Sequence, residues 1–486
     1  MKRIFLIFAV CLGTFMATLD ISIVNVALPA IGQDLNANMS LLQWIIDSYA
    51  LCLSALILSV GPISDRYGRK KVWLIGVAIF TLGSAICAFS TTSSTLIGGR
   101  IIQGIAAAAL IPGALSIITQ AFTNDIERIK IIGIWSAVSA LSLIIGPILG
   151  GFLVDTLDWT TLFLINIPIG CITLLVGWLG IKESSDPDKA AFDPIGQILS
   201  IFALGGITFA LIEAGDKGWG NYLTLSGLTL GVIASLCFIF IEGKVAKPLL
   251  PIFLFKQNTF FFQYNMASFS LGFATYSNVF FIALFLQKGQ GWGALEAGLR
   301  MAPEFIAMAL FSFSFGKLSK FFSVRNLMMM GFVLIAIASM MLTQVNFDTP
   351  YIPIALMLFI LGAGMGMATP AISSLVMASV EKAYSGIASA VMNALRQTGM
   401  TLGIALLGTL MTHRAVDRLL NDNQLAAVFT EKELEQMING VPITSSILIE
   451  NTIHSAFTSG FNVAMLGGAV VILASLSLMI RRKIVQ

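Results

Sequence analysis

Residues 72–89 read VWLIGVAIFTLGSAICAF and contain no charged side chain. An apolar run of this length is typical of a helix that crosses the roughly 30 Å hydrocarbon core of a bilayer. The whole chain has the same character: of 486 residues, 57% are hydrophobic and 11% are charged, whereas soluble domains carry about 25% charged residues. Because backbone polar groups in hydrocarbon must be bonded internally, these long runs predict an all-α membrane protein rather than a barrel of short alternating strands.

Similar runs recur along the whole chain. We expect about fourteen membrane-crossing spans, with the approximate extents 5–28, 41–63, 72–89, 94–118, 131–154, 160–181, 195–213, 222–242, 258–286, 294–316, 326–345, 351–376, 385–411 and 453–480. If the N-terminus is cytoplasmic, alternate loops should hold most of the Lys and Arg residues. The predicted inner segments do, and the predicted outer loops hold only Lys217, Lys288, Arg414, Arg418 and Lys432. The charge pattern therefore predicts a multi-pass protein with both termini in the cytoplasm.

The remaining bulk properties exclude several kinds of segment and site. The apolar run after Lys2 and Arg3 is too long for a signal peptide and carries Asp20, so we expect a retained first helix. A net charge of +3 gives no indication of a nucleic-acid partner. The cysteines lie within apolar runs and lack paired spacing, which favours packing over a disulfide or metal site. They are Cys11, Cys52, Cys87, Cys171 and Cys237.

A weak internal repeat divides the chain. Residues 133–138 (GIWSAV) recur as 386–391 (GIASAV), residues 61–69 (GPISDRYGR) have a degraded copy at 316–324 (GKLSKFFSV), and Gly104 with Pro112 is echoed by Gly362 with Pro370. The offsets are nearly equal and in matching order, as in the parallel repeats of transporters. We expect an N-terminal six-helix half over 1–181, a linker with two extra spans over 182–257, and a C-terminal six-helix half over 258–486. An extracytoplasmic loop is expected near 412–451.

Five sequence motifs occur in order along the chain. They are 19–29 (LDISIVNVALP), 61–71 (GPISDRYGRKK), 100–104 (RIIQG), 146–151 (GPILGG) and 166–170 (NIPIG). Together they resemble motifs of the major facilitator superfamily, specifically its fourteen-helix drug:proton antiporters, which include quaternary-ammonium and multidrug exporters. The resemblance covers essentially the whole chain and implies the major facilitator fold: two six-helix halves plus two extra central helices. In the second half Lys320 replaces Asp65 and Leu358 replaces Arg100, so we expect the chemistry of these motifs in the first half only.

The resemblance also gives conformational roles to two of the motifs. It implies that Asp65 is the latch of the loop motif, pairing across the halves and capping a helix. It implies that the glycine–proline motif is a bending helix face tied to antiport. Positive-inside topology alone would explain the basic residues, and close helix packing would explain the glycines equally well. The residues concerned are Gly61, Asp65, Arg66, Gly68, Arg69, Gly146, Pro147, Gly150 and Gly151.

Ionisable residues within the spans are the candidates for coupling transport to protons, because they are costly in a bilayer unless paired or hydrated. Helical rise places Asp20 about 22 Å from the inner face, and Arg100 and Asp47 each about 9 Å from the outer face. In a core of roughly 30 Å these three depths agree to within a turn. We expect Asp20 to carry the proton, with Arg100 as its switchable partner and Asp47 nearby. A static ion pair that fixes helix packing is the alternative.

Four further polar residues form the predicted substrate site. Glu304 follows Pro303 about 15 Å into its span, and suits a cationic substrate, a second proton, or an interhelical hydrogen bond. Arg396 is similarly deep and could pair with Glu304 or bind an anionic group. Asn25 and Gln103, in the first and fourth spans, complete the set.

These features predict a proton-coupled antiporter that exports small amphipathic, cationic drugs or toxic compounds by alternating access. Such a multidrug efflux protein would confer antibiotic resistance, use no cofactor beyond the proton gradient, and lie as a monomer in the bacterial cytoplasmic (inner) membrane. Its partners would be a small-molecule substrate, protons and lipid, with a periplasmic adaptor protein left open. The alternatives are export of a specific metabolite, peptide or siderophore, or proton symport. An intramembrane enzyme is disfavoured, since His413 and His454 lack metal-ligand spacing.

Overall fold

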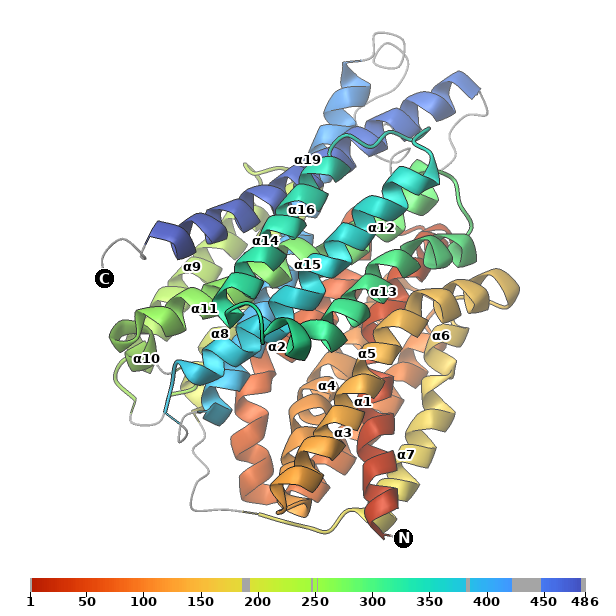
Figure 1. The fold of residues 1–486 in the computed structure, drawn as a ribbon. Helices are drawn as coiled ribbons and strands as arrows, with labels where there is room; N and C mark the ends of the chain where they lie inside the picture. Colours follow the sequence, from red (N-terminus) through yellow and green to blue (C-terminus); the bar gives the residue numbers. More distant parts are fainter. Residues whose placement is uncertain are drawn as a thin grey trace.

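The computed structural model describes residues 2–185, 193–245, 248–250, 252–381, 385–421 and 447–481. Throughout these residues the regular structure is helical, and Figure 1 shows long helices packed side by side. The expected all-α fold is thus confirmed.

The helices follow the predicted spans closely. The first group is α1 (Lys2–Asp34), α2 (Met39–Tyr67), α3 (Arg69–Ala88), α4 (Ser93–Ala121), α5 (Asp125–Thr156), α6 (Thr161–Leu164) and α7 (Asn166–Gly180). Next come α8 (Pro194–Lys217), α9 (Tyr222–Glu242) and the short α10 (Ile252–Gln257). The second group is α11 (Thr259–Leu271), η2 (Gly272–Tyr276), α12 (Ser277–Leu284), η3 (Phe285–Gly289), α13 (Ala294–Leu318), α14 (Val324–Leu342), α15 (Tyr351–Ala378), α16 (Ser385–Leu420) and α19 (Ile447–Arg481). Each predicted span coincides with one helix or with a consecutive run of them.

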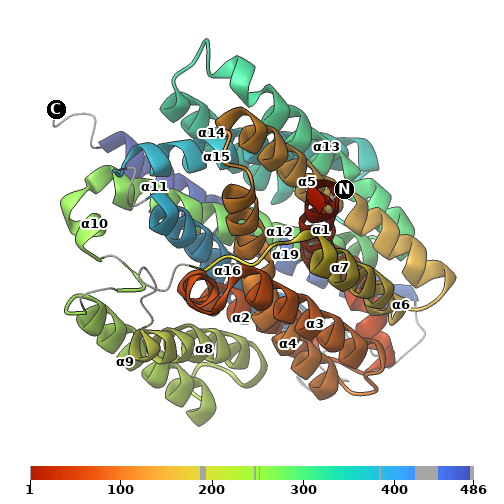
Figure 2. The same cartoon turned by 90° about the horizontal axis from the view of Figure 1, so that it is seen from below.

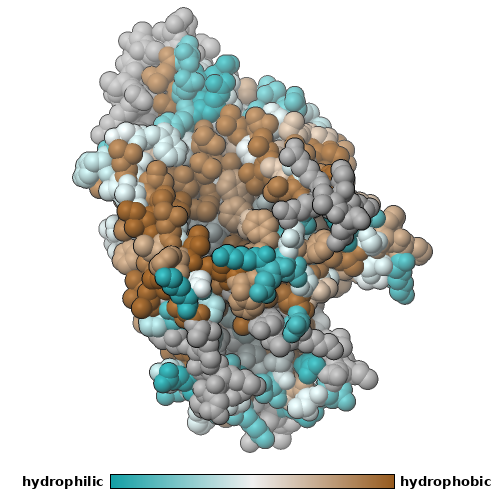
Figure 3. Space-filling model, turned by 90° about the vertical axis from the view of Figure 1, so that its left-hand side faces the viewer, coloured by the Kyte–Doolittle hydropathy of each residue, from teal (hydrophilic) through white to brown (hydrophobic). Residues whose placement is uncertain are grey.

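Length and composition make this a multi-pass membrane protein. Among the described residues, twelve helices or helical runs are long and apolar enough to cross a membrane. The two other predicted spans, α13 and α16, have 25 and 36 residues and carry charged side chains in their interior, such as Glu304 and Arg396. Figure 3 shows apolar side chains spread across the middle of one face, with many of the hydrophilic ones toward its upper and lower ends.

The predicted loop near 412–451 is partly helical. Helix α16 continues to Leu420, and α19 begins at Ile447. Arg414 and Asp417 form an ion pair of 3.4 Å on successive turns of α16, and such pairs favour the helix on an exposed segment. The rest of this predicted loop, 422–446, lies outside the described residues.

Each group of helices packs mainly with itself, and two helix pairs form most of the contact between the groups, while α1 also touches α12 and α13. Within the first group α3 packs on α4 and α1 on α5, and within the second group α13 and α14 pack on α15. The groups meet where α5 packs on α13 and where α2 packs on α16. Figure 1 shows the first group in red to yellow and the second in green to blue.

The α8–α9 pair lies beside the α2–α16 contact (Figure 2). Gln197 of α8 donates to the carbonyl of Ala55 on α2 at 2.9 Å and accepts a short hydrogen bond from Ser59. Farther along, Thr409 of α16 donates to the carbonyl of Leu211 at 2.6 Å. Helix α8 is therefore hydrogen-bonded to one helix of each group.

We expect Gln197→Leu to lower the thermal midpoint of the purified protein. The substitution leaves the Ala55 carbonyl and the Ser59 hydroxyl without their buried partner, which costs about 1–3 kcal/mol. Gly205→Ala on the same helix is the matched control, because an added Cβ there meets nothing within 4 Å. Equal melting temperatures for Gln197→Leu and the control would show that Gln197 does not anchor α8.

Candidate functional site

A buried ion pair joins α1 to α4. An Nη1 donor of Arg100 makes a short contact with Asp20 Oδ2, and both residues are 1% exposed. The guanidinium also donates from Nε to the carbonyl of Ile45 at 3.1 Å and from Nη1 to Gln103 Oε1 at 2.8 Å. The structure thus brings the predicted proton carrier and its predicted partner into direct contact.

Neutral polar groups complete the surroundings of this pair. Asp20 Oδ1 accepts from Gln103 Nε2 at 2.9 Å and from Asn166 Nδ2 at 3.3 Å. Gln103 also donates to the hydroxyl of Ser84 at 2.8 Å, and the Tyr49 ring lies 4.5 Å from the guanidinium carbon. A carboxylate with these donors is well stabilised while it stays charged. Gln103, predicted as a substrate residue, is therefore hydrogen-bonded to both members of the ion pair.

Small residues bring the helices close enough to build this network. A Cβ added to Gly104 would lie 2.5 Å from the Tyr49 carbonyl oxygen, so α4 and α2 are in near-backbone contact. Gly83 and Gly99 make the same kind of contact between α3 and α4. Close approach through small residues is how helices associate tightly in membranes.

Asp47 and Glu304 are buried carboxyl groups of a different kind. Both are 0% exposed, and neither has a hydrogen-bond partner for either carboxyl oxygen within the described part of the chain. An unpaired charge is costly in such surroundings, and binding a proton removes that cost. Asp47 is not hydrogen-bonded to the Asp20 pair. Glu304 lies where α13 packs on α15, with its backbone against Gly362.

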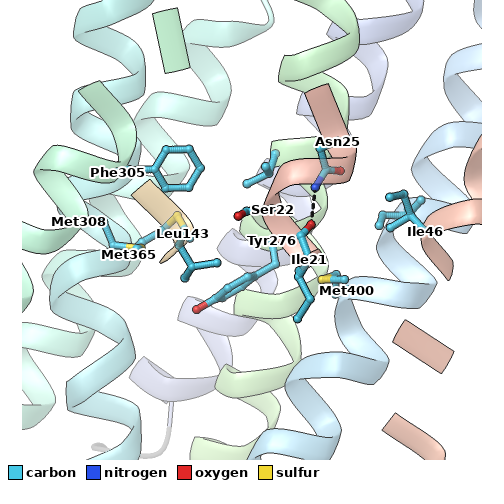
Figure 4. A pocket seen from close by; sticks show the side chains of 12 residues that line it. Ile21, Ser22, Asn25, Ile46, Leu143, Tyr276, Phe305, Met308, Met365 and Met400 are labelled. Atoms are coloured by element: carbon cyan, nitrogen blue, oxygen red, sulfur yellow. Dashed lines mark hydrogen bonds between the residues drawn. The ribbon is translucent and has the colours of Figure 1, made fainter. Parts of the chain in front are cut away.

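A small cavity lies between the two groups of helices (Figure 4). Its volume is about 30 Å³, enough for about one water molecule, so a drug-sized substrate requires its walls to separate. The lining is mostly apolar and comes from both groups: Ile21, Ser22, Asn25, Ile46, Leu143, Tyr276, Val279, Phe305, Met308, Met365, Met400 and Ile404. Of the four predicted substrate residues, Asn25 lines this cavity.

The two buried carboxyl groups flank the cavity without lining it. Asp47 follows Ile46 and Glu304 precedes Phe305 in the sequence, and both of these neighbours belong to the lining. The carboxyl groups therefore belong to residues adjacent in sequence to the lining, but they have no exposed surface.

Arg396 lies over the ring of a residue that lines the cavity, and it does not pair with Glu304. Its Nη2 donates to Asn393 Oδ1 at 2.6 Å, and its guanidinium carbon lies 5.5 Å from the centroid of the Tyr276 ring. Tyr276 lines the cavity and ends the π-helical turn η2. Such turns within α-helices are frequently found at functional sites.

The glycine–proline motif of α5 packs against two neighbouring helices, α1 and α13. Gly146 and Gly150 are one turn apart and face Ser22 and Ile23 of α1. Residues four apart share a helix face, so the motif's other pair, Pro147 and Gly151, lies on a second face. This face packs against α13.

Contacts on this second face join the groups at the predicted outer side. A Cβ added to Gly151 would overlap the backbone of Ala294, and one added to Gly298 would overlap the carbonyl of Pro147. At the end of α5, Asp155 Oδ2 accepts from the backbone N–H of Leu295 at 2.8 Å, so one group caps the first turn of a helix in the other.

The loop motif makes its contacts near the predicted inner side. Asp65 pairs with Arg69 at 2.7 Å on the same hairpin, and within the described residues it forms no ion pair with the second group. Gly68 has φ = 104°, which favours glycine. The capping carboxylate is Glu183, which accepts from the backbone N–H of Lys70 at 3.0 Å and that of Lys71 at 3.1 Å. Gly61 and Arg66 are exposed.

Several of these residues were not predicted from the sequence. Asn166 belongs to the motif at 166–170, and a lone amide at the start of an apolar span is a signal for a buried hydrogen bond. Tyr276, Asp155 and Glu183 had no such signal, because their contacts depend on how helices distant in sequence are packed.

The comparisons with known proteins agree with this architecture. The family model described as Major Facilitator Superfamily matches residues 10–404. The chain is 32% identical to the methylenomycin A resistance protein of Bacillus subtilis (strain 168), covering 82% of this chain and 86% of that protein. It is 31% identical to the multidrug efflux pump LfrA of Mycolicibacterium smegmatis, covering 82% and 79%.

The same fold is found in a solved structure. A bacterial homolog of the human lysosomal transporter Spinster, in an inward-facing and unoccupied conformation, matches with a TM-score of 0.67 at 18% identity. The match covers 98% of this chain and 96% of that one. Sequence motifs, helix arrangement and family match thus lead to one conclusion: the chain belongs to the major facilitator superfamily of membrane transporters.

Proposed function

We propose that this protein is a proton-driven exporter of small amphipathic compounds, including antibiotics. The observation that carries the proposal is the fully buried Asp20–Arg100 pair. Support for export of drugs comes from the relatives, whose names describe antibiotic resistance and multidrug efflux. Export of one specific metabolite, peptide or siderophore, and proton symport, remain the competing functions.

The ion pair links protonation to a conformational change, because the position of Arg100 depends on the charge of Asp20. Protonation of Asp20 removes the negative charge that holds Arg100, and the guanidinium then turns to its other acceptors, Gln103 and the Ile45 carbonyl. Coupling requires that proton and substrate bind with different affinity to the two conformations of the transporter. Asp47 and Glu304, buried without partners in the described residues, are sites for a second proton.

The proposal includes alternating access between two halves, 1–181 and 258–486, with α8 and α9 inserted in the linker 182–257. In the residues that the structure describes, the hydrogen bonds between these halves join Gln43 to Ile404 and Ala405, Val26 to Gln287, and Asp155 to Ala294 and Leu295. They lie toward the predicted outer side, which favours an outer seal and movement at the inner side. We place both termini in the cytoplasm, and the protein as a monomer in the bacterial cytoplasmic membrane.

The cationic substrate predicted from Glu304 stays a prediction of the sequence. The Glu304 side chain has no exposed surface, so a cation could reach its carboxyl group only if that side chain turned out of its buried position.

Everted membrane vesicles from an efflux-deficient bacterium that overproduces the protein provide the test. Respiration acidifies the vesicle interior, and we expect addition of a transported antibiotic or dye to dissipate the pH gradient, since antiport moves protons out as substrate moves in. A protonophore should abolish substrate uptake. Uptake that is insensitive to the protonophore would refute proton coupling, and a substrate efflux that carries protons outward would indicate symport.

A further inference from the structure

Helix α16 presents one continuous face to the central cavity. Met400 and Ile404 line the cavity, and Arg396 lies four residues before Met400. Residues four apart share a helix face, so Arg396 lies one turn from the lining, toward the predicted inner side. A substrate that entered from the predicted inner side would therefore approach the apolar wall past this turn of α16.

The Arg396 guanidinium is held in place but keeps most of its donors available. The hydrogen bond to Asn393 Oδ1 and the Tyr276 ring define its orientation. A guanidinium has five N–H donors, and the side chain is only partly buried. Across the described ranges it forms no salt bridge.

In the part of the chain that the structure describes, no carboxylate lines the cavity to offset this positive charge. Asp20 is neutralised by Arg100, and Asp47 and Glu304 are enclosed with no exposed surface. The cavity lining itself contains no charged side chain. The charge that an incoming molecule meets is therefore that of Arg396, which attracts anions and repels cations.

The rest of the wall suits an apolar body. Phe305, Met308, Met365 and Met400 supply aromatic and thioether groups (Figure 4), and methionine side chains adapt readily to different shapes. We propose that Arg396 determines specificity at this site, and that the substrates are amphipathic anions: an aromatic or alicyclic body with a carboxylate or similar anionic group. This inference rests on the proposed function and concerns its substrate class.

Matched naphthalene compounds test the charge preference directly. The purified protein is reconstituted in phosphatidylcholine vesicles, and binding of 1-naphthoate, methyl 1-naphthoate and 1-naphthyltrimethylammonium is measured. We expect naphthoate to bind at least about tenfold tighter than the ammonium compound, which corresponds to about 1.4 kcal/mol. Arg396→Gln should remove the preference, and Arg396→Lys should retain it in part. Arg300→Gln is the matched control, because Arg300 is paired with Glu296 near the predicted outer end of α13.

Each outcome decides the question. Equal or tighter binding of the ammonium compound, no measurable binding of naphthoate, or an unchanged preference in Arg396→Gln would overturn the inference. Repeating the titration with phosphatidylglycerol in the vesicles separates two sources of the anionic group, since competition by this lipid identifies a lipid headgroup as the occupant. Proton-coupled export of a cationic dye such as ethidium, unchanged in Arg396→Gln, would leave the proposed function standing and refute the inference alone. Failure of the vesicle assay for every compound would refute the proposed function itself.

Discussion

We expect proton-coupled transport to fall to background in Asp20→Asn, while the protein still folds and reaches the membrane. The amide has nearly the same shape as the carboxyl group, and its oxygen can still accept from Gln103 and Asn166. It cannot exchange a proton, and it carries no charge to hold Arg100. The measurement is substrate-driven dissipation of the pH gradient in everted vesicles, normalised to the amount of protein.

Asp34→Asn is the matched control for this variant. Asp34 ends the same helix, accepts a hydrogen bond from Trp159 Nε1 at 2.9 Å, and lies outside the Asp20 network. We expect this control to transport as the wild type does. Wild-type coupling in Asp20→Asn would show that the buried pair is a static packing contact.

A stability measurement separates the two roles of the pair. Arg100→Gln leaves Asp20 without its charged partner, and breaking a buried pair in this way costs about 3–5 kcal/mol. Combining Arg100→Gln with Asp20→Asn should recover much of that stability, because no unpaired charge remains. It should not recover transport. Recovery of both would favour the packing role.

The helices could be predicted from the sequence because a membrane crossing has a nearly constant length. Residues 294–316 and 385–411 were recognised as spans, although Glu304 and Arg396 lower their hydropathy. Depth along a helix follows from a constant rise per residue. That is why Asp20 and Arg100 could be placed at one level before their contact was seen.

Lateral position could not be predicted in this way. Glu304 and Arg396 have similar depths, yet the backbone of Glu304 packs against Gly362 of α15 and the Arg396 guanidinium lies over the Tyr276 ring. Which residues meet at one depth depends on the rotation and order of the helices, and a repeat in the sequence does not give these. The same limit applies to Asn166 and Tyr49 beside the ion pair.

Capping residues were missed for a related reason. Glu183, in the linker after α7, caps α3, and Asp155 at the end of α5 caps α13. In each case the cap and the helix are far apart in sequence, whereas the capping signals that can be read locally lie within a few residues of the helix start.

Gly151→Val should shift the transporter away from the outward-closed conformation. Its Cβ would overlap the backbone of Ala294 at the contact between α5 and α13, and overpacking of this kind costs about 1–3 kcal/mol. The cost applies only where the two helices touch. If the outward-open conformation separates them, its population rises roughly 5- to 150-fold relative to the closed one.

Labelling of a cysteine in the cavity measures this shift. Met365→Cys in a background without the five native cysteines places a thiol in the lining, and a membrane-impermeant maleimide is added to intact cells. We expect faster labelling in Gly151→Val than in its parent. Gly133→Val on the same helix is the control, because a Cβ there meets nothing within 4 Å. If the rate in Gly151→Val equals that of the control, the α5–α13 contact is not the outer seal, and the gate must be sought at α2 and α16, where Gln43 bonds to the backbone of Ile404.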